Sequence, residues 1–272
     1  MFADLHLHSV YSDGTDTPDE LVMLAKNNGV QVISIADHDT VAAYNNVQHD
    51  AEVRIIPAIE VSTVLGHSYL HILGYYIDTR SDALAEYIQK VSTEKTENTR
   101  INFENAVKQG CFRYKWERVL ELNTSQPRIS GVHVVRAMEK DNFIINGMGL
   151  WDMFYKYFRA ESADFIPTET TTAYDAIDII KKVNGIPIIA HPKSAENDAI
   201  IGALIRYGAQ GLEVYHPIHT EDDVKKYRQL AEVNHLYISG GTDWHGKSNG
   251  AEITHFGMCG LDSSEYPILS VK

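Results

Sequence analysis

The sequence predicts an α/β fold, a distorted (β/α)7 barrel that carries an inserted helical subdomain. Short β-branched and apolar runs recur along the chain, and several are separated by helical patterns. Residues 80–165 break this alternation, because they hold helical stretches and no convincing strand. We therefore expect a barrel domain built from residues 1–79 and 166–272, with residues 80–165 inserted as a cap.

Seven strands are expected from the apolar runs. The segment VSTVLGHSYL between Glu60 and His71 is too short for a right-handed crossover, so the third and fourth strands should pair antiparallel and make the barrel irregular. The expected strands are residues 2–8, 32–36, 55–62, 70–77, 186–190, 211–215 and 236–239.

The clearest helix is predicted over residues 173–184. An apolar stripe that includes Ile177 and Ile180 marks its buried face, and Gly185 is placed to adopt the left-handed conformation that ends a helix. Within the insertion, helical stretches are expected near residues 82–109, 115–122, 130–141 and 148–159.

Composition limits the possible functions. The chain has 272 residues, of which 44% are hydrophobic, enough to bury a substantial core. Its net charge of -13 disfavours a broad nucleic-acid surface but permits a small anionic substrate. Neither a membrane-spanning run nor a leader pattern is found, so we expect a cytoplasmic protein with no membrane partner. Cys111 and Cys259 are expected to be reduced thiols.

Potential metal ligands stand where the expected strands end or begin. In a barrel these positions share one rim, and side chains two residues apart in a strand point the same way. Imidazole and carboxylate ligands suit Zn, Mn or Fe, and their number exceeds what one ion needs. The candidate ligands are His6, His8, Asp13, His38, Glu60, His71, His191, Asp243 and His245.

The order of these motifs resembles the PHP (polymerase and histidinol phosphatase) family, within the wider amidohydrolase group. The matching elements are H-x-H, S-D-G, A-D-H-D, a mid-chain glutamate, a single histidine in HILGYY, then AHP and TDWHG. The helical insertion resembles the small-phosphoesterase branch of that family, which includes nucleotide and ribose-phosphate hydrolases. The resemblance implies a metal-dependent phosphoesterase.

The resemblance also implies how the ligands divide among roughly two to three divalent ions. His6, His8 and Asp243 would hold the first ion together with Glu60, which would bridge to a second ion. His71 and His191 would complete the second site. Asp13, a histidine in some relatives, would form a third site with His38 and His245. Asp37 would orient an imidazole.

Basic side chains in the insertion are candidates for binding phosphate. His133 and Arg136 lie three residues apart on one face of an expected helix. The related branch has Arg-Pro-His-x-x-Arg here, and this chain lacks the first arginine, so Arg128 is a candidate to replace it. A solvated helix face is the alternative interpretation for all three. Lys193 and His219 are further candidates, because they follow barrel strands.

The predicted reaction follows from charge. Three divalent cations outweigh three ligand carboxylates, and two ions that share Glu60 can activate a bridging hydroxide for attack on phosphorus. Asp243 could accept the proton of that water. His133 or His219 could protonate the leaving oxygen. The expected substrate is a small phosphate ester such as a nucleotide, a nucleotide bisphosphate, a phosphoribose or a cyclic phosphate.

Other functions stay open at this point. Hydrolysis of a C–N or C–O bond is disfavoured, because the chain lacks a strand-end lysine that could be carbamylated. The complete ligand set argues against a non-catalytic PHP module. A histidinol-phosphate-type phosphatase and a 5′–3′ exonuclease acting on short oligonucleotides remain alternatives. Tyr114, Trp116 and Trp151 could stack on bases or form the core of the insertion.

Overall fold

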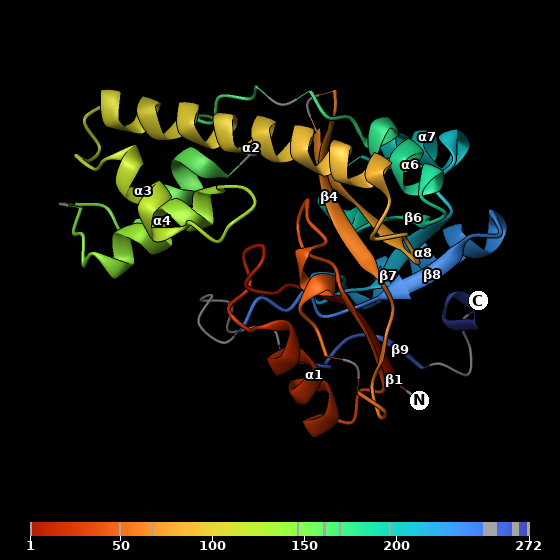
Figure 1. The fold of residues 1–272 in the computed structure, drawn as a ribbon. Coiled ribbons are helices and arrows are strands. Elements are labelled where there is room, and N and C mark those ends of the chain that lie inside the picture. The colour runs from red at the N-terminus through yellow and green to blue at the C-terminus, as the bar shows by residue number, and fades with distance from the viewer. Residues whose placement is uncertain are drawn as a thin grey trace. The chain divides into compact units, whose positions relative to one another are not determined.

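The computed structural model has a mixed α/β fold that divides into two compact units (Figure 1). It describes residues 2–48, 50–66, 68–145, 147–159, 162–168, 170–195, 197–246, 255–262 and 267–270. The first unit comprises residues 1–87 and 171–272, and the second comprises residues 88–170. The boundary between residues 87 and 88 falls inside helix α2 (Asp82–Lys108), so this one helix begins in the first unit and continues into the second.

The strands of the first unit form two sheets. One sheet has the order β3-β2-β1-β9, and the other has the order β4-β5-β6-β7-β8. The first contains β1 (Phe2–Leu7), β2 (Val32–Ile35), β3 (Arg54–Ile55) and β9 (Leu261–Asp262). The second contains β4 (Ala58–Leu65), β5 (Ser68–Tyr75), β6 (Ile186–Ile189), β7 (Gly211–Tyr215) and β8 (Tyr237–Gly240).

The expected hairpin is confirmed. Strands β4 and β5 pair antiparallel with Glu60 opposite Leu73, whereas β6, β7 and β8 pair in parallel. The single run predicted over residues 55–62 is wrong, because the chain changes sheets at Pro57. Proline has no N–H to donate to a strand ladder, so it is a natural point for this interruption.

A closed barrel is not detected among the described strands. Isolated bridges join the two sheets, one between His38 and Glu60 and one between Leu7 and Trp244. The His38 bridge is flanked by hydrogen bonds from Asp39 N to Glu60 O (2.9 Å) and from Glu60 N to Asp37 O (3.2 Å). These bridges bring the carboxyl ends of β1 and β2 close to β4 and to the segment after β8.

Four helices of the first unit follow strands or precede them. They are α1 (Pro18–Asn27), α6 (Ala173–Lys182), α7 (Asp198–Tyr207) and α8 (Glu221–Val233). Three of these helices begin with a capping box, which satisfies free N–H groups at the N-terminus. The capping residues are Thr17 for α1, Thr172 for α6 and Thr220 for α8. Short 3-10 turns cover Ala42–Asn45, Pro192–Ala195 and Pro267–Ser270.

The end of α6 differs from the prediction. Asn184, with φ of 62°, adopts the left-handed conformation that was expected of Gly185. Gly185 is needed for a different reason, because a Cβ there would lie 2.6 Å from Cγ2 of Ile77. The glycine therefore permits close packing between the end of α6 and the chain that follows β5.

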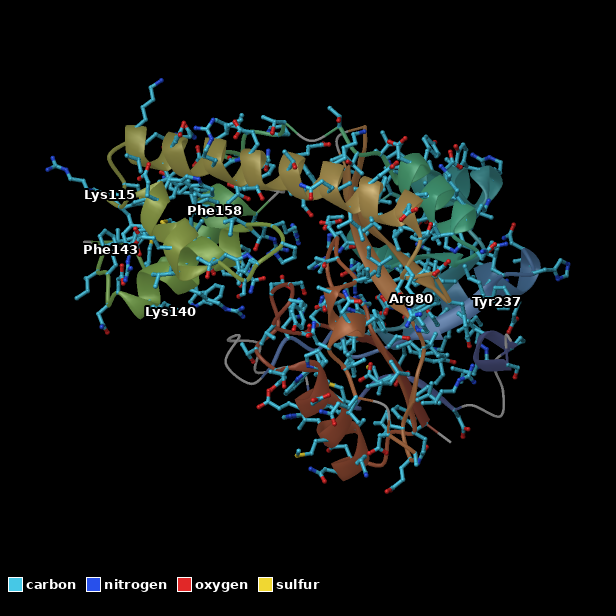
Figure 2. All side chains as sticks on the ribbon, viewed as in Figure 1. Arg80, Lys115, Lys140, Phe143, Phe158 and Tyr237 are labelled. Atoms are coloured by element: carbon cyan, nitrogen blue, oxygen red, sulfur yellow. The ribbon has the colours of Figure 1, made fainter. Side chains whose placement is uncertain are left out.

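The second unit is helical. After α2 it contains α3 (Trp116–Leu122), α4 (Gly131–Lys140) and α5 (Leu150–Met153), which continues into a π-helix over Phe154–Phe158. Its core includes Phe103, Val134, Met138 and Phe158, whereas the Lys140 side chain extends into solvent (Figure 2). No helix in the described part of the chain combines the length and the apolar character needed to cross a bilayer.

Candidate metal centre

The predicted ligands gather in the first unit around Glu60, which is 1% exposed. Oε2 of Glu60 lies 3.0–3.3 Å from a ring nitrogen of His6, His8 and His38. Oε1 lies 2.9 Å from Nδ1 of His71 and 3.1 Å from Nε2 of His191. The two oxygens of one carboxylate thus face two different sets of histidines.

Two further carboxylates complete the cluster. Oδ1 of Asp243 lies 3.0 Å from Nε2 of His8 and 3.4 Å from Nε2 of His6. Asp13 lies 3.3 Å from Nε2 of His245 and 3.8 Å from a ring nitrogen of His38. Two groups of four side chains have ligand atoms that all lie within 4.8 Å of one another. These groups are His6, His8, Glu60 and Asp243, and His8, Asp13, His38 and His245.

Several of these atoms are buried without a hydrogen bond. Within the described residues, Nε2 of His6, Nε2 of His8 and Oε2 of Glu60 have no hydrogen-bond partner. A buried polar atom without a partner costs free energy unless a ligand or an ion satisfies it. The donor set, nitrogen and carboxylate oxygen, suits a divalent transition metal, so the cluster supports divalent metal binding.

The histidines and carboxylates of the cluster stabilise each other's charged forms. Although burial opposes its charged form, the close carboxylates of Asp243 and Glu60 raise the pKa of His8 to about 10. Burial alone would raise the pKa of Glu60, but the neighbouring histidines hold it well below its usual value. Neighbouring histidines likewise hold the pKa values of Asp13 and Asp243 well below the usual range, against the effect of burial. These carboxylates are therefore ionised and require positive charge beside them, from protonated histidines or from cations.

Glu213 and His216, neither of them a predicted site residue, also belong to this cluster. Glu213, on β7, lies 2.8 Å through Oε1 from Nδ1 of His6. His216 Nε2 lies 3.4 Å from Oδ2 of Asp243, while its Nδ1 accepts from the backbone N of Ile218 (3.3 Å). One signal could have revealed Glu213, because a charged residue inside the apolar run GLEVY must find a buried partner.

Asp37 contacts the cluster through serines. Its oxygens accept from Ser9 N (2.7 Å) and from the hydroxyls of Ser9 and Ser12 (both 2.6 Å). The Ser12 hydroxyl in turn lies 3.5 Å from Nδ1 of His8. Asp37 thus fixes the loop after β1 and reaches an imidazole through a hydroxyl group.

The two basic candidates of the first unit lie near α8. Nδ1 of His219 donates to Val214 O (2.8 Å), and burial lowers the pKa of this histidine. Lys193 donates to Oδ2 of Asp223 (2.6 Å) and to Ile218 O (3.1 Å). Two of the three N–H donors of Lys193 are thus occupied, and its charge is paired with Asp223.

The other basic candidates belong to the second unit. Arg128 and His133 are 8% and 2% exposed, and Arg136 is partly buried on α4. Nδ1 of His133 accepts from Ser130 N (2.9 Å), so this histidine caps the helix that carries Arg136. Tyr114, Trp116 and Trp151 pack against the apolar core of the unit, which favours their interpretation as core residues.

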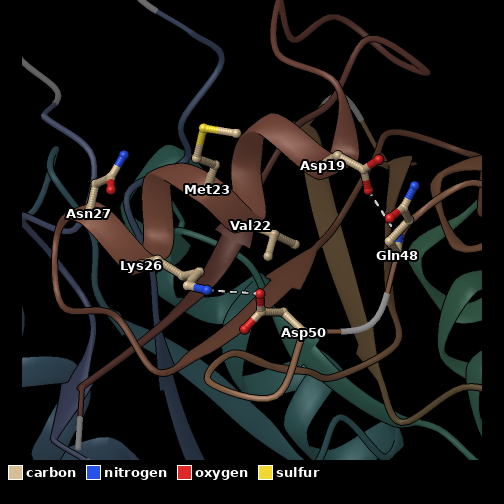
Figure 3. Close-up of a pocket in the computed structure, with 7 residues that line it drawn as sticks. All are labelled: Asp19, Val22, Met23, Lys26, Asn27, Gln48 and Asp50. Atoms are coloured by element: carbon tan, nitrogen blue, oxygen red, sulfur yellow. Dashed lines mark hydrogen bonds and ion pairs between the residues drawn. The ribbon is translucent and has the colours of Figure 1, made fainter.

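A surface cavity lies beside α1 in the first unit. Lys26 contacts Asp50 (3.0 Å) across it, and Asp19 accepts from the backbone N of Gln48 (2.9 Å) at its edge (Figure 3). The residues that line it are Asp19, Val22, Met23, Lys26, Asn27, Gln48 and Asp50. The predicted ligands are not among these lining residues.

Curated relatives match nearly the full chain. A phosphoribosyl 1,2-cyclic phosphate 1,2-diphosphodiesterase of Eggerthella lenta is 27% identical, over 91% of this chain and 95% of the relative. A 3′,5′-nucleoside bisphosphate phosphatase of Chromobacterium violaceum is 29% identical, over 91% and 88%. The 5′–3′ exoribonuclease Rnm of Salmonella typhimurium is 27% identical, over 89% and 84%.

Solved structures and a family model agree with these relatives. A candidate metal-dependent phosphoesterase of Bifidobacterium adolescentis superposes with a TM-score of 0.83 at 25% identity, over 99% of this chain and 96% of that chain. An amidohydrolase of Chromobacterium violaceum has the same fold, with a TM-score of 0.79 at 24% identity, over 96% and 91%. The PHP domain model matches residues 4–250. The chain therefore belongs to the PHP family of metal-dependent phosphoesterases.

Proposed function

We propose that this chain hydrolyses a phosphate ester of a small metabolite, using roughly two to three divalent ions held by the cluster around Glu60. One observation carries the proposal. Glu60 is buried, and its two oxygens face two separate sets of histidines, as a carboxylate shared by two ions must. The unsatisfied nitrogens of His6 and His8 are directed at the same place.

The proposed ligand sets follow the predicted division. His6, His8 and Asp243 would hold the first ion, and His71 and His191 the second, with Glu60 shared by the two. Asp13, His38 and His245 would hold the third. Nitrogen and carboxylate ligands accommodate Mn, Fe and Zn. Divalent ions at these positions supply Lewis acidity toward phosphoryl oxygens and lower the pKa of water.

Two side chains are proposed to handle protons. Asp243 is ionised, because the histidines around it keep its pKa well below the usual range against the effect of burial. Its side chain is 27% exposed, so it can reach a water molecule at the edge of the cluster. His219 is the proposed donor to the leaving oxygen, through Nε2, because its Nδ1 already donates to Val214 O. Burial lowers its pKa, so the negative charge of a bound phosphate is proposed to stabilise the doubly protonated ring.

The substrate class is proposed from the relatives and from the basic side chains. The relatives are named for a cyclic phosphate, a nucleoside bisphosphate and RNA, all of which are esters of phosphoric acid. Arg128, His133, Arg136 and Lys193 are the proposed phosphate-binding residues. Residues 80–165 are proposed to act as the cap that selects the substrate. A cytoplasmic location stays a prediction.

A 5′–3′ exoribonuclease is the second candidate, because the relative from Salmonella typhimurium covers 89% of this chain. It uses the same chemistry at phosphorus and differs in the leaving group. A histidinol-phosphate-type phosphatase has the same requirement for metal. A non-catalytic PHP module has no need for the unsatisfied ligand atoms of His6, His8 and Glu60.

A hydrolysis assay tests these functions directly. Phosphate release is measured for monoesters, and products are separated by chromatography for cyclic phosphates and RNA, because cleavage of a diester frees no phosphate. Protein loaded separately with Mn, Fe or Zn is incubated with sugar phosphates, 3′,5′-bisphosphates, cyclic phosphates, histidinol phosphate and 5′-phosphorylated short RNA. We expect turnover of a small ester that disappears in the Glu60→Gln variant. Turnover of RNA alone would favour the second candidate. A metal-loaded protein that cleaves no ester contradicts the proposal.

A further inference from the structure

Glu213 uses both of its oxygens within the cluster. It lies on β7 and is 0% exposed. Oε1 is 2.8 Å from Nδ1 of His6, and Oε2 accepts from the backbone N of His191 at 2.7 Å. One carboxylate therefore contacts a proposed ligand of the first ion and a proposed ligand of the second.

The bond to His6 fixes which ring nitrogen carries the proton. An ionised carboxylate can only accept hydrogen bonds, so Nδ1 of His6 must donate to it. In the neutral ring, Nε2 is then left with its lone pair free to bind a metal. Nε2 lies 3.2 Å from Oε2 of Glu60 and 3.4 Å from Oδ1 of Asp243, so this lone pair faces the cluster.

The bond to His191 stabilises an unusual backbone conformation. His191 has φ of 24°, a value in the left-handed region that non-glycine residues adopt only at a cost. Its N–H is directed at Oε2 of Glu213, and its ring places Nε2 3.1 Å from Oε1 of Glu60. The carboxylate of Glu213 thus compensates for the strain that directs this ring at the cluster.

We propose that Glu213 is a positioning residue that orients one histidine of each of the first two metal sites. The inference rests on the proposed function, because it assigns Glu213 a role toward the ions that His6 and His191 would hold. An amide cannot replace this carboxylate, since its NH2 group would face one of the two N–H donors. In Glu213→Gln, His6 must change tautomer and present a protonated Nε2, or His191 must lose its acceptor.

The test compares metal affinity in four proteins: the wild type, Glu213→Gln, Glu213→Asp and Asp175→Asn. Metal-free protein is titrated with zinc or manganese against a chromophoric chelator. Asp175→Asn is the matched control, because it makes the same carboxylate-to-amide change in the first unit at the cap of α6, where Asp175 bonds to Thr172. We expect Glu213→Gln to lose about 10- to 100-fold in affinity, and the control to match the wild type.

A spectroscopic measurement separates orientation from general destabilisation. In the zinc-loaded wild type, nitrogen-15 spectra of the histidine rings should show a proton on Nδ1 of His6, assigned by its loss in His6→Asn. Thermal unfolding of the metal-free variants reports whether the fold is intact. If Glu213→Gln does not fold, the test uses Glu213→Asp. The shorter aspartate side chain cannot reach both donors, so the metal affinity of this variant should also fall at least tenfold.

The outcomes distinguish the two proposals. A wild type that binds no metal overturns the proposed function. A wild type that binds metal, with a folded Glu213 variant of equal affinity, overturns only the role of Glu213. An Asp175→Asn control that loses as much as Glu213→Gln also overturns that role, because the effect would then be one of charge or stability. A zinc-loaded wild type with its proton on Nε2 of His6 overturns it directly.

Discussion

Both units of this chain bury polar side chains, but among the described residues the first gathers unsatisfied histidine and carboxylate atoms in one cluster, whereas the second satisfies the buried amides of Asn98 and Asn102. In the second unit, Asn102 accepts from Ile166 N (2.7 Å) and donates to Ile166 O (3.0 Å). Asn98 donates to the same carbonyl (2.9 Å) and to the Thr168 hydroxyl (3.0 Å). These buried amides of α2 thus hold the backbone of the segment after the π-helix.

The first unit buries histidines and carboxylates whose bonding capacity is not used up. Within the described residues, Nε2 of His6, Nε2 of His8 and Oε2 of Glu60 lack hydrogen bonds although each lies close to the others. The contrast teaches that buried polarity alone does not mark a site. A cluster of unsatisfied nitrogen and carboxylate atoms does, so cations should affect the first unit and leave the second unchanged.

The largest expected effect comes from Glu60→Gln. The substitution keeps size but removes the charge that two ions would share, so turnover should fall by about a thousandfold or more. Steady-state kinetics and elemental analysis of the purified variant measure turnover and bound metal. Circular dichroism serves as the control for the fold. Near-normal turnover in a metal-containing variant would show that Glu60 does not bridge, and would remove the main distinction between the units.

The next effect tests whether the second unit contributes to recognition. Arg136→Lys keeps the charge but loses the planar fork that can bind two phosphate oxygens, so kcat/KM should fall by roughly 2–4 kcal/mol of lost transition-state binding. Metal content should not change. If Arg136 holds a second phosphate, kcat/KM for p-nitrophenyl phosphate should fall less than kcat/KM for the true substrate. If Arg136 holds the phosphate that is cleaved, the two values should fall equally.

Arg118→Lys is the matched control for this prediction. Arg118 lies in the same unit and pairs with Asp141 (2.7 Å) and Glu121 (3.1 Å) at the surface. The same change of residue type should therefore leave kcat/KM close to the wild-type value. Full activity of Arg136→Lys on every substrate would mean that the insertion does not select the substrate, and Lys193 and His219 would become the better candidates.

A smaller effect is expected from pH. The close carboxylates of Asp243 and Glu60 raise the pKa of His8 to about 10 against the effect of burial, so the metal-free protein holds this proton at neutral pH. A metal must displace it, so affinity should rise with pH by about tenfold per unit for each proton released. Chelator competition at pH 6, 7 and 8 measures the slope. Affinity that does not vary with pH would contradict the charge balance inferred for the cluster.

Much of the fold could be predicted from short-range patterns. The run at the start of the chain and the runs that became β2, β6 and β7 were found because β-branched residues and turn signals are local. The pairing of β4 with β5 followed from the shortness of their connection. The division into two sheets could not be predicted. It depends on which strands, distant in the sequence, pair with the chain on each side of Pro57 and with the segment after β8.

The candidate site was predictable for a related reason. His6 lies near the carboxyl end of β1 and Asp243 follows β8, and strand ends of this kind were expected to share one rim, so their order along the chain located them. Glu60 lies near the start of β4 instead, at the bridge with His38. Glu213 was missed because its partners are 207 and 22 residues away in the sequence. Its role depends on a hydrogen bond to a ring nitrogen, which no spacing rule reveals.

The smallest effect on the site should come from the core of the second unit. Met138 is 0% exposed on α4, and Met138→Ala should destabilise that unit by about 2–5 kcal/mol through loss of packing and the cavity left behind. Metal affinity should stay at the wild-type value, because the cluster belongs to the other unit. Hydrogen exchange should show faster exchange in α4 with little change in β1 and β7. If α4 positions Arg136, kcat/KM should also fall, by less than in Arg136→Lys. A loss of metal affinity in Met138→Ala would show that the two units are coupled, and would contradict the independence on which the comparison rests.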